Sequence, residues 1–123
     1  MPKQLILFAI ASLSLLATAI RVDAHAFLVR AEPRVGSSVK KAPNEVRIWF
    51  SEPVAPALSL IKVFNAAGKQ VDKSDTHPDR SDRAVVRVSL TPALSPGTYK
   101  VIWRVTSVDT HVTSGDFRFQ VAP

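Results

Sequence analysis

From His25 to the end of the chain, apolar and polar residues alternate with a period of two. Side chains two residues apart in an extended strand project to the same face, so this spacing is typical of strands with one buried face. The alternation predicts six strands, at residues 27–31, 46–50, 58–63, 85–90, 98–106 and 117–121. The polar stretch 72–82 contains four aspartates and no large apolar residue, and it predicts a mobile surface loop.

Proline and glycine residues separate the expected strands, as they do in antiparallel β-sandwiches. At 123 residues the chain has room for one such domain, and no linker or repeat indicates a second. We therefore predict an all-β antiparallel sandwich with a single core. The residues expected to fill that core are the bulky aromatics Trp49, Phe50, Phe64, Tyr99, Trp103, Phe117 and Phe119.

The first 24 residues have the three-part layout of a secretory signal. A positive start at Lys3 precedes an apolar run of about sixteen residues, which is shorter than the ~20 that a membrane-spanning helix needs. We therefore favour a cleaved signal peptide over an uncleaved anchor. Small residues allow cleavage after Ala24, which would make His25 the new amino terminus, or after Ala19. The pattern alone leaves both cleavage sites open.

Charge and sulfur content restrict the function. The net charge is +6, but the basic residues are scattered among apolar ones and not clustered as in nucleic-acid binders. We interpret them as a solubilising surface and expect no nucleic-acid partner. The sequence has no cysteine, and its one methionine is Met1. Disulfides, thiolate ligands and thiol catalysis are therefore excluded, and cleavage would also remove the only thioether.

Three histidines and one nearby carboxylate are the candidates for metal chemistry. Asp109 and His111 are two residues apart, so an extended segment would direct both to one ion, although a surface ion pair is the simpler interpretation. An amino-terminal His25 would add two nitrogens, its α-amine and its imidazole, in one compact chelate. Three nitrogens and one oxygen, with no sulfur, suit Cu(II) better than zinc, which prefers tetrahedral sites.

Several motifs together resemble the CopC family of periplasmic copper-resistance proteins. The matching segments, spread over the whole chain after residue 24, are His25, Glu32-Pro33, Gly36, Trp49–Val54, Leu94–Val105, Ser107–His111, Gly115 and Phe117–Phe119. The resemblance implies a Greek-key sandwich of the cupredoxin-like or immunoglobulin-like type, with a signal peptide at 1–24 and the mature domain at 25–123. Because family members begin at the histidine, it also favours cleavage after Ala24.

The resemblance further implies a site and a role. One Cu(II) ion per chain would be bound by His25, Asp109 and His111, with Glu52 as a candidate outer or weak ligand. The chain would be a monomeric periplasmic copper carrier or buffer in copper homeostasis and resistance, without enzymatic activity. Its expected partner is an inner-membrane CopD-type copper transporter. Some family members have a methionine-rich Cu(I) site, which this sequence lacks, and His77 matches no family ligand.

Two alternative functions come from different classes. A histidine brace also resembles the copper centre of lytic polysaccharide monooxygenases, but an Asp109 ligand would help saturate the ion, and the short chain leaves little room for a substrate platform. The second alternative is a metal-free immunoglobulin-like interaction module, which a failure to bind Cu(II) would favour. Hydrolysis finds little support, since Asp109 and His111 are too close in sequence for a triad and no nucleophile elbow occurs.

Overall fold

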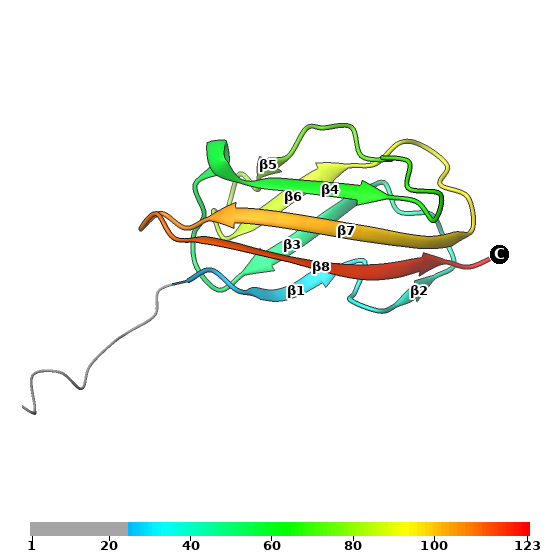
Figure 1. Cartoon of the computed structure of the whole chain (residues 1–123), viewed down its shortest axis with the longest axis horizontal. Coiled ribbons are helices and arrows are strands. Elements are labelled where there is room, and N and C mark those ends of the chain that lie inside the picture. Colours follow the sequence, from blue (N-terminus) through cyan, green and yellow to red (C-terminus); the bar gives the residue numbers. More distant parts are fainter. Residues whose placement is uncertain (1–24) are drawn as a thin grey trace, which may run out of the picture.

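The computed structural model describes residues 25–123, which form eight β-strands and one short 3-10 helix (Figure 1). The elements are β1 Leu28–Glu32, β2 Ser38–Val39, β3 Glu45–Phe50, η1 Pro56–Leu58, β4 Leu60–Phe64, β5 His77–Pro78, β6 Val85–Ser89, β7 Gly97–Thr106 and β8 Val112–Val121. The expected signal peptide lies outside the described residues. Nothing helical between residues 25 and 123 is long and apolar enough to cross a membrane.

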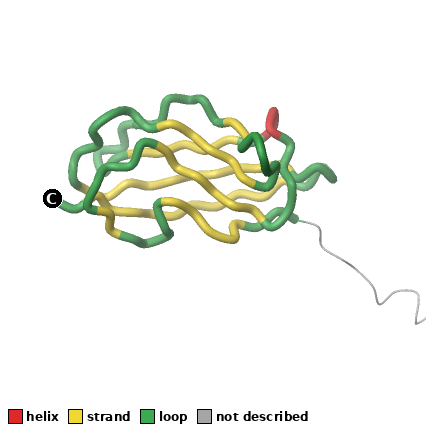
Figure 2. Tube along the Cα trace, turned by 180° about the vertical axis from the view of Figure 1, so that it is seen from behind, coloured by secondary structure: helices red, strands yellow, loops and turns green. Residues whose placement is uncertain are grey.

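The strands form two four-stranded sheets. Figure 2 shows the strands from behind, with loops joining them at both ends. One sheet has the order β1-β3-β6-β5, and the other has the order β2-β8-β7-β4. The chain crosses between the sheets after β1, β2, β3, β4 and β6, and such crossings are typical of Greek-key sandwiches. The predicted all-β sandwich is confirmed.

One pairing differs from the expected antiparallel arrangement. Strand β2 runs parallel to β8, with Ser38 opposite Gln120 and Val39 opposite Val121. No hairpin joins these two strands, so the connection does not force them to run in opposite directions. The sheet that contains β8 is therefore mixed, whereas the other sheet is antiparallel throughout.

The core lies between the sheets and is built largely from the inward-facing residues of β3, β7 and β8. Phe50 packs edge-on against Trp103 with ring centres 5.2 Å apart, and Tyr99 stacks on Phe119 at 5.3 Å. Because strand alternation directs them inward, five of the seven expected core aromatics are buried: Phe50, Tyr99, Trp103, Phe117 and Phe119.

The prediction that Trp49 and Phe64 fill the core is wrong. Trp49 lies on the outer face of its sheet, because the alternation in β3 gives it the side opposite to the buried residues. There the guanidinium of Arg30 lies 3.8 Å from a Trp49 ring centre, and that of Arg47 lies at 5.4 Å. These cation–π contacts accommodate the large ring at the surface. Phe64 ends β4 and is only half-buried.

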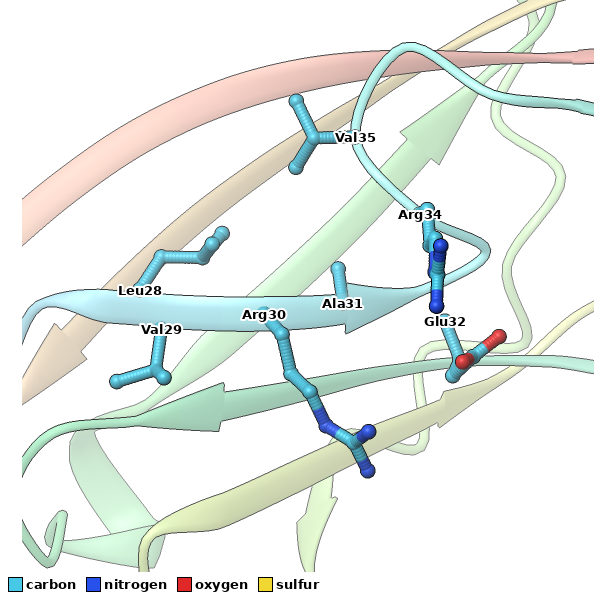
Figure 3. A pocket seen from close by; sticks show the side chains of 7 residues that line it. All are labelled: Leu28, Val29, Arg30, Ala31, Glu32, Arg34 and Val35. Atoms are coloured by element: carbon cyan, nitrogen blue, oxygen red, sulfur yellow. The ribbon is translucent and has the colours of Figure 1, made fainter.

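Strand β1 does not keep the expected alternation, because a β-bulge interrupts its register. Figure 3 shows Val29 and Arg30 on the side of the strand opposite to Leu28 and Ala31, although Val29 and Arg30 are adjacent in sequence. Ala31 is buried, whereas Val29 is 64% exposed. The bulge thus gives this edge strand an apolar residue that faces solvent.

Two strand boundaries also differ from the prediction. Strand β8 begins at Val112 and not at residue 117, because residues 112–116, although mostly polar, pair residue by residue with β7. Strand β4 begins at Leu60, because Pro56 starts the 3-10 helix that contains Leu58. The long β7–β8 hairpin that results carries the loop 107–111 at its tip.

The polar stretch 72–82 is fastened to the sandwich and contains the short strand β5. The Asp72 carboxylate is buried and accepts the Val63 N–H at 2.8 Å. The Asp75 carboxylate accepts the Ser89 N–H at 2.8 Å. The expectation of a loop wholly at the surface is therefore wrong for Asp72, whose burial is compensated by hydrogen bonds that spacing cannot reveal.

Candidate metal centre

His25 and His111 lie at one end of the sandwich, although they are far apart in sequence. His25 shortly precedes β1, and His111 ends the loop that joins β7 to β8; Figure 1 shows both segments at the same end. The ring centres are 4.6 Å apart, and the ring planes are inclined by 36°. The fold therefore brings together the two histidines that the sequence selects as ligands.

The loop 107–111 is held in shape by Ser107, of which only 2% is exposed. The Ser107 N–H donates to the His111 carbonyl at 2.9 Å, and the Ser107 carbonyl accepts the Thr110 N–H at 2.9 Å. Thr110 has a φ of 75°, in the left-handed region that a β-branched residue rarely adopts. The hydrogen bonds of Ser107 thus hold a strained turn in one conformation and fix the direction of Asp109 and His111.

Asp109 and His111 form a pair within this loop. The Nδ1 atom of His111 lies 3.3 Å from one Asp109 oxygen, and the Ser107 hydroxyl donates a hydrogen bond to the other oxygen. Mainly because of the Ser107 hydrogen bond, and then because of His111, the pKa of Asp109 is lowered, so the carboxylate is ionised at neutral pH. The His111 side chain is 54% exposed and that of Asp109 is 39% exposed, so a solvated ion has access to both.

Within residues 25–123, no three His, Asp or Glu side chains are gathered closely enough to form a ready-made metal site. The expected trio is present only in part: the two imidazoles are adjacent, while Asp109 bonds to Ser107 and His111. The third nitrogen of the expected site is the α-nitrogen of His25, which in this chain is the peptide nitrogen that follows Ala24. Two imidazoles beside an ionised carboxylate are donors that suit a divalent ion such as Cu(II) or Zn(II).

Glu52 and His77 occupy different places. Glu52 is exposed on the segment after β3, and the Val54–Ser107 bridge joins this segment to the loop 107–111. His77 is exposed on β5, the edge strand opposite to β1 in the same sheet, and its Nδ1 bonds to the Asp75 carbonyl at 2.7 Å. The structure therefore separates His77 from the His25–His111 pair.

Sequence reasoning misses two hydroxyl residues beside His25. Ser51 accepts a hydrogen bond from the Phe27 N–H, and Thr113 donates one to the Ala26 carbonyl. Both bonds join segments that are distant along the chain, so local spacing does not predict them, although Ser51 lies within the matching segment Trp49–Val54. Ala26 between these contacts has no exposed surface.

These features define a small β-sandwich protein with paired histidines and a carboxylate at one end. The family model of the CopC domain matches residues 28–122, and the chain belongs to this family. The matched range includes Asp109 and His111 and begins just after His25.

Individual relatives agree with this assignment. The chain is 35% identical over 98 residues to "Copper transport protein CutJ" of Bacillus subtilis, a match that covers 80% of this chain and only 18% of CutJ. It is 33% identical over 108 residues to "Copper resistance protein C" of Pseudomonas syringae pv. tomato, covering 80% of this chain and 82% of the relative. The crystal structure of CopC from Methylosinus trichosporium OB3b superimposes with a TM-score of 0.74 at 32% identity, covering 80% of this chain and 95% of that one.

Proposed function

We propose that this chain is an exported Cu(II)-binding protein that carries or buffers copper in the periplasm. In this proposal the signal peptide 1–24 is cleaved, and residues 25–123 bind one ion through His25, Asp109 and His111. The observation that carries the proposal is the 4.6 Å separation of the two imidazole rings. Membership of the CopC family, with relatives named for copper resistance and copper transport, supports copper as the ion.

The donor atoms are the physical reason for choosing Cu(II). Two nitrogens bound to one ion lie within about 4 Å of each other, since each bond is about 2.0 Å long. Imidazole rings whose centres are 4.6 Å apart are close enough for this. Cleavage after Ala24 would add an α-amine, which ordinarily has a pKa near 8 and so yields its proton readily to a metal at neutral pH. Nitrogen and oxygen donors without sulfur favour Cu(II), which stands highest in the divalent affinity order.

The exposure of the site suits a carrier. His111 and Asp109 are both open to solvent, so an ion can enter and leave without a large rearrangement. A carboxylate ligand leaves fewer positions on the ion for oxygen, and we therefore propose binding without enzymatic turnover. The partner that we propose for this monomeric carrier is an inner-membrane copper transporter of the CopD type.

The test compares copper affinities of chains that differ only at the proposed ligands. Residues 25–123, beginning at His25, are titrated with Cu(II) by calorimetry and by paramagnetic resonance. We expect His25→Ala, or His111→Ala, to weaken binding by more than about 100-fold, since each change removes a ligand and not an outer partner. His77→Ala is the matched control and should leave the affinity unchanged, because His77 lies on the opposite sheet edge.

Two results would contradict the proposal. If the His25→Ala chain binds Cu(II) as tightly as the chain that begins at His25, the amino-terminal chelate does not exist. If the intact mass of exported protein shows that it begins at Ile20 or retains its leader, the α-amine of His25 is never available.

A further inference from the structure

The three residues that begin the described chain are held by hydrogen bonds from both sheets. From the first sheet, Ser51 follows β3, and its hydroxyl accepts the Phe27 N–H at 2.9 Å. The same hydroxyl donates to the His25 carbonyl at 3.4 Å, and the Ser51 N–H donates to the Phe27 carbonyl at 2.8 Å. Ser51 therefore bonds to the main chain on both sides of Ala26.

From the second sheet, Thr113 on β8 donates its hydroxyl to the Ala26 carbonyl at 2.7 Å. Thr113 pairs with the buried Val105 of β7, so its side chain lies on the inner face of its sheet. Ala26 has no exposed surface and belongs to the core cluster. The Thr113 bond thus crosses the sandwich and fixes a fully buried residue that is adjacent to His25.

We propose that Ser51 and Thr113 are positioning residues for copper, an inference that rests on the proposed function. Chain ends usually fray, and a ligand on a frayed end must be ordered each time that an ion binds. Here the Thr113 hydroxyl, bonded to the buried Ala26, and the Ser51 hydroxyl, bonded to Phe27 and His25, set the direction of His25 before any ion arrives. A preorganised donor binds more tightly because less conformational entropy is lost on binding.

The chemistry of the two side chains explains why hydroxyls are needed. The Ala26 carbonyl is buried and cannot exchange its bond to Thr113 for water without opening the end of the core. The Ser51 hydroxyl accepts a hydrogen bond from the Phe27 N–H and donates one to the His25 carbonyl. A short hydroxyl side chain can do both from one oxygen, whereas alanine can do neither. Loss of either hydroxyl should let His25 move away from His111 while the sandwich stays folded.

The test uses residues 25–123 beginning at His25 and measures Cu(II) affinity, the paramagnetic resonance spectrum of the bound ion, and stability in urea. Thr113→Val keeps the shape and removes the hydroxyl, and Thr113→Ser keeps the hydroxyl. Ser51→Ala is the independent second variant. We expect Thr113→Val and Ser51→Ala each to weaken Cu(II) binding about 10-fold and to alter the spectrum, and Thr113→Ser to bind as the parent does.

Thr76→Val is the matched control for general loss of stability. The Thr76 hydroxyl accepts the Ile61 N–H at 3.1 Å and donates to the Ile61 carbonyl at 3.3 Å. Ile61 is on β4, which β7 separates from β8, so this variant loses a comparable hydroxyl bond away from His25. We expect it to lower stability without changing the copper affinity.

The possible failures can be told apart. A parent chain that does not bind Cu(II) overturns the proposed function and this inference with it. A parent that binds, together with Thr113→Val and Ser51→Ala variants of equal affinity, overturns the positioning role alone. An affinity loss of the same size in Thr76→Val would also overturn it, because the effect would then follow from general destabilisation.

Discussion

Gly115 is a position where a single methyl group should destabilise the hairpin that carries the candidate ligands. Gly115 pairs with Trp103 across β7 and β8, and the indole ring lies over it. A Cβ atom added at Gly115 would lie 2.5 Å from Cζ2 and 2.8 Å from Cε2 of Trp103. Carbon atoms in contact are ordinarily about 3.5–4.0 Å apart, so Gly115→Ala requires the ring or the strand to move by about 1 Å.

The size of the effect follows from how little room the ring has. Trp103 is 7% exposed and packs edge-on against Phe50, with ring centres 5.2 Å apart, so it cannot move without disturbing the core. Overpacking of this kind costs about 1–3 kcal/mol, and the lower chain entropy of alanine offsets about 0.4–1 kcal/mol of that. We expect a net loss of about 1.3 kcal/mol, which lowers the Tm of a domain of this size by about 5–10 °C.

Urea unfolding followed by tryptophan fluorescence measures this loss. The control is Ser114→Ala, an exposed neighbour on the same strand, which should change the free energy of unfolding by less than about 0.5 kcal/mol. In a Trp103→Leu background the added methyl has space, so the cost of Gly115→Ala should fall and a double-mutant cycle should show coupling. A Gly115→Ala chain as stable as the parent, with no coupling to Trp103, would show that the ring does not lie over Gly115.

Two further predictions concern the core and the pH dependence of stability. Phe119→Ala should lower the free energy of unfolding by about 3–5 kcal/mol in urea, because the ring is 1% exposed and stacks on Tyr99; a loss below about 1 kcal/mol would contradict that burial. Hydrogen bonds from the Ser81 hydroxyl and N–H, and then Arg87, lower the pKa of Asp79 to about 2. An unfolded aspartate has a pKa of about 3.9, so the ionised Asp79 stabilises the folded chain above about pH 4. This stabilisation is lost as the pH falls towards 2. Asp79→Asn removes this titration, so the free energy of unfolding should change less between about pH 4 and pH 2 than it does in the parent chain. If the free energies of the two chains change in parallel with pH, the lowered pKa of Asp79 is disproved.

Much of the fold could be read from local pattern. The alternation in Glu45–Phe50 and in Gly97–Thr106 reports which side chains face the core, because the two-residue period of a strand is a property of the backbone itself. The pairing of β2 with β8, the polar start of β8 and the burial of Asp72 could not be read in this way. Each depends on a partner segment that is distant along the chain.

The candidate site also has features that the sequence predicts and features that depend on distant segments. Asp109 and His111 are two residues apart, so their proximity follows from the sequence, and the unusual chemistry of an amino-terminal His25 is also a sequence inference. Only the tertiary structure decides that His25 lies beside His111, that Ser107 orients Asp109, and that Ser51 and Thr113 hold residues 25–27 in place. The physical reason is that covalent spacing fixes distances over a few bonds, whereas contacts between the two sheets exist only once the shared core has packed them together.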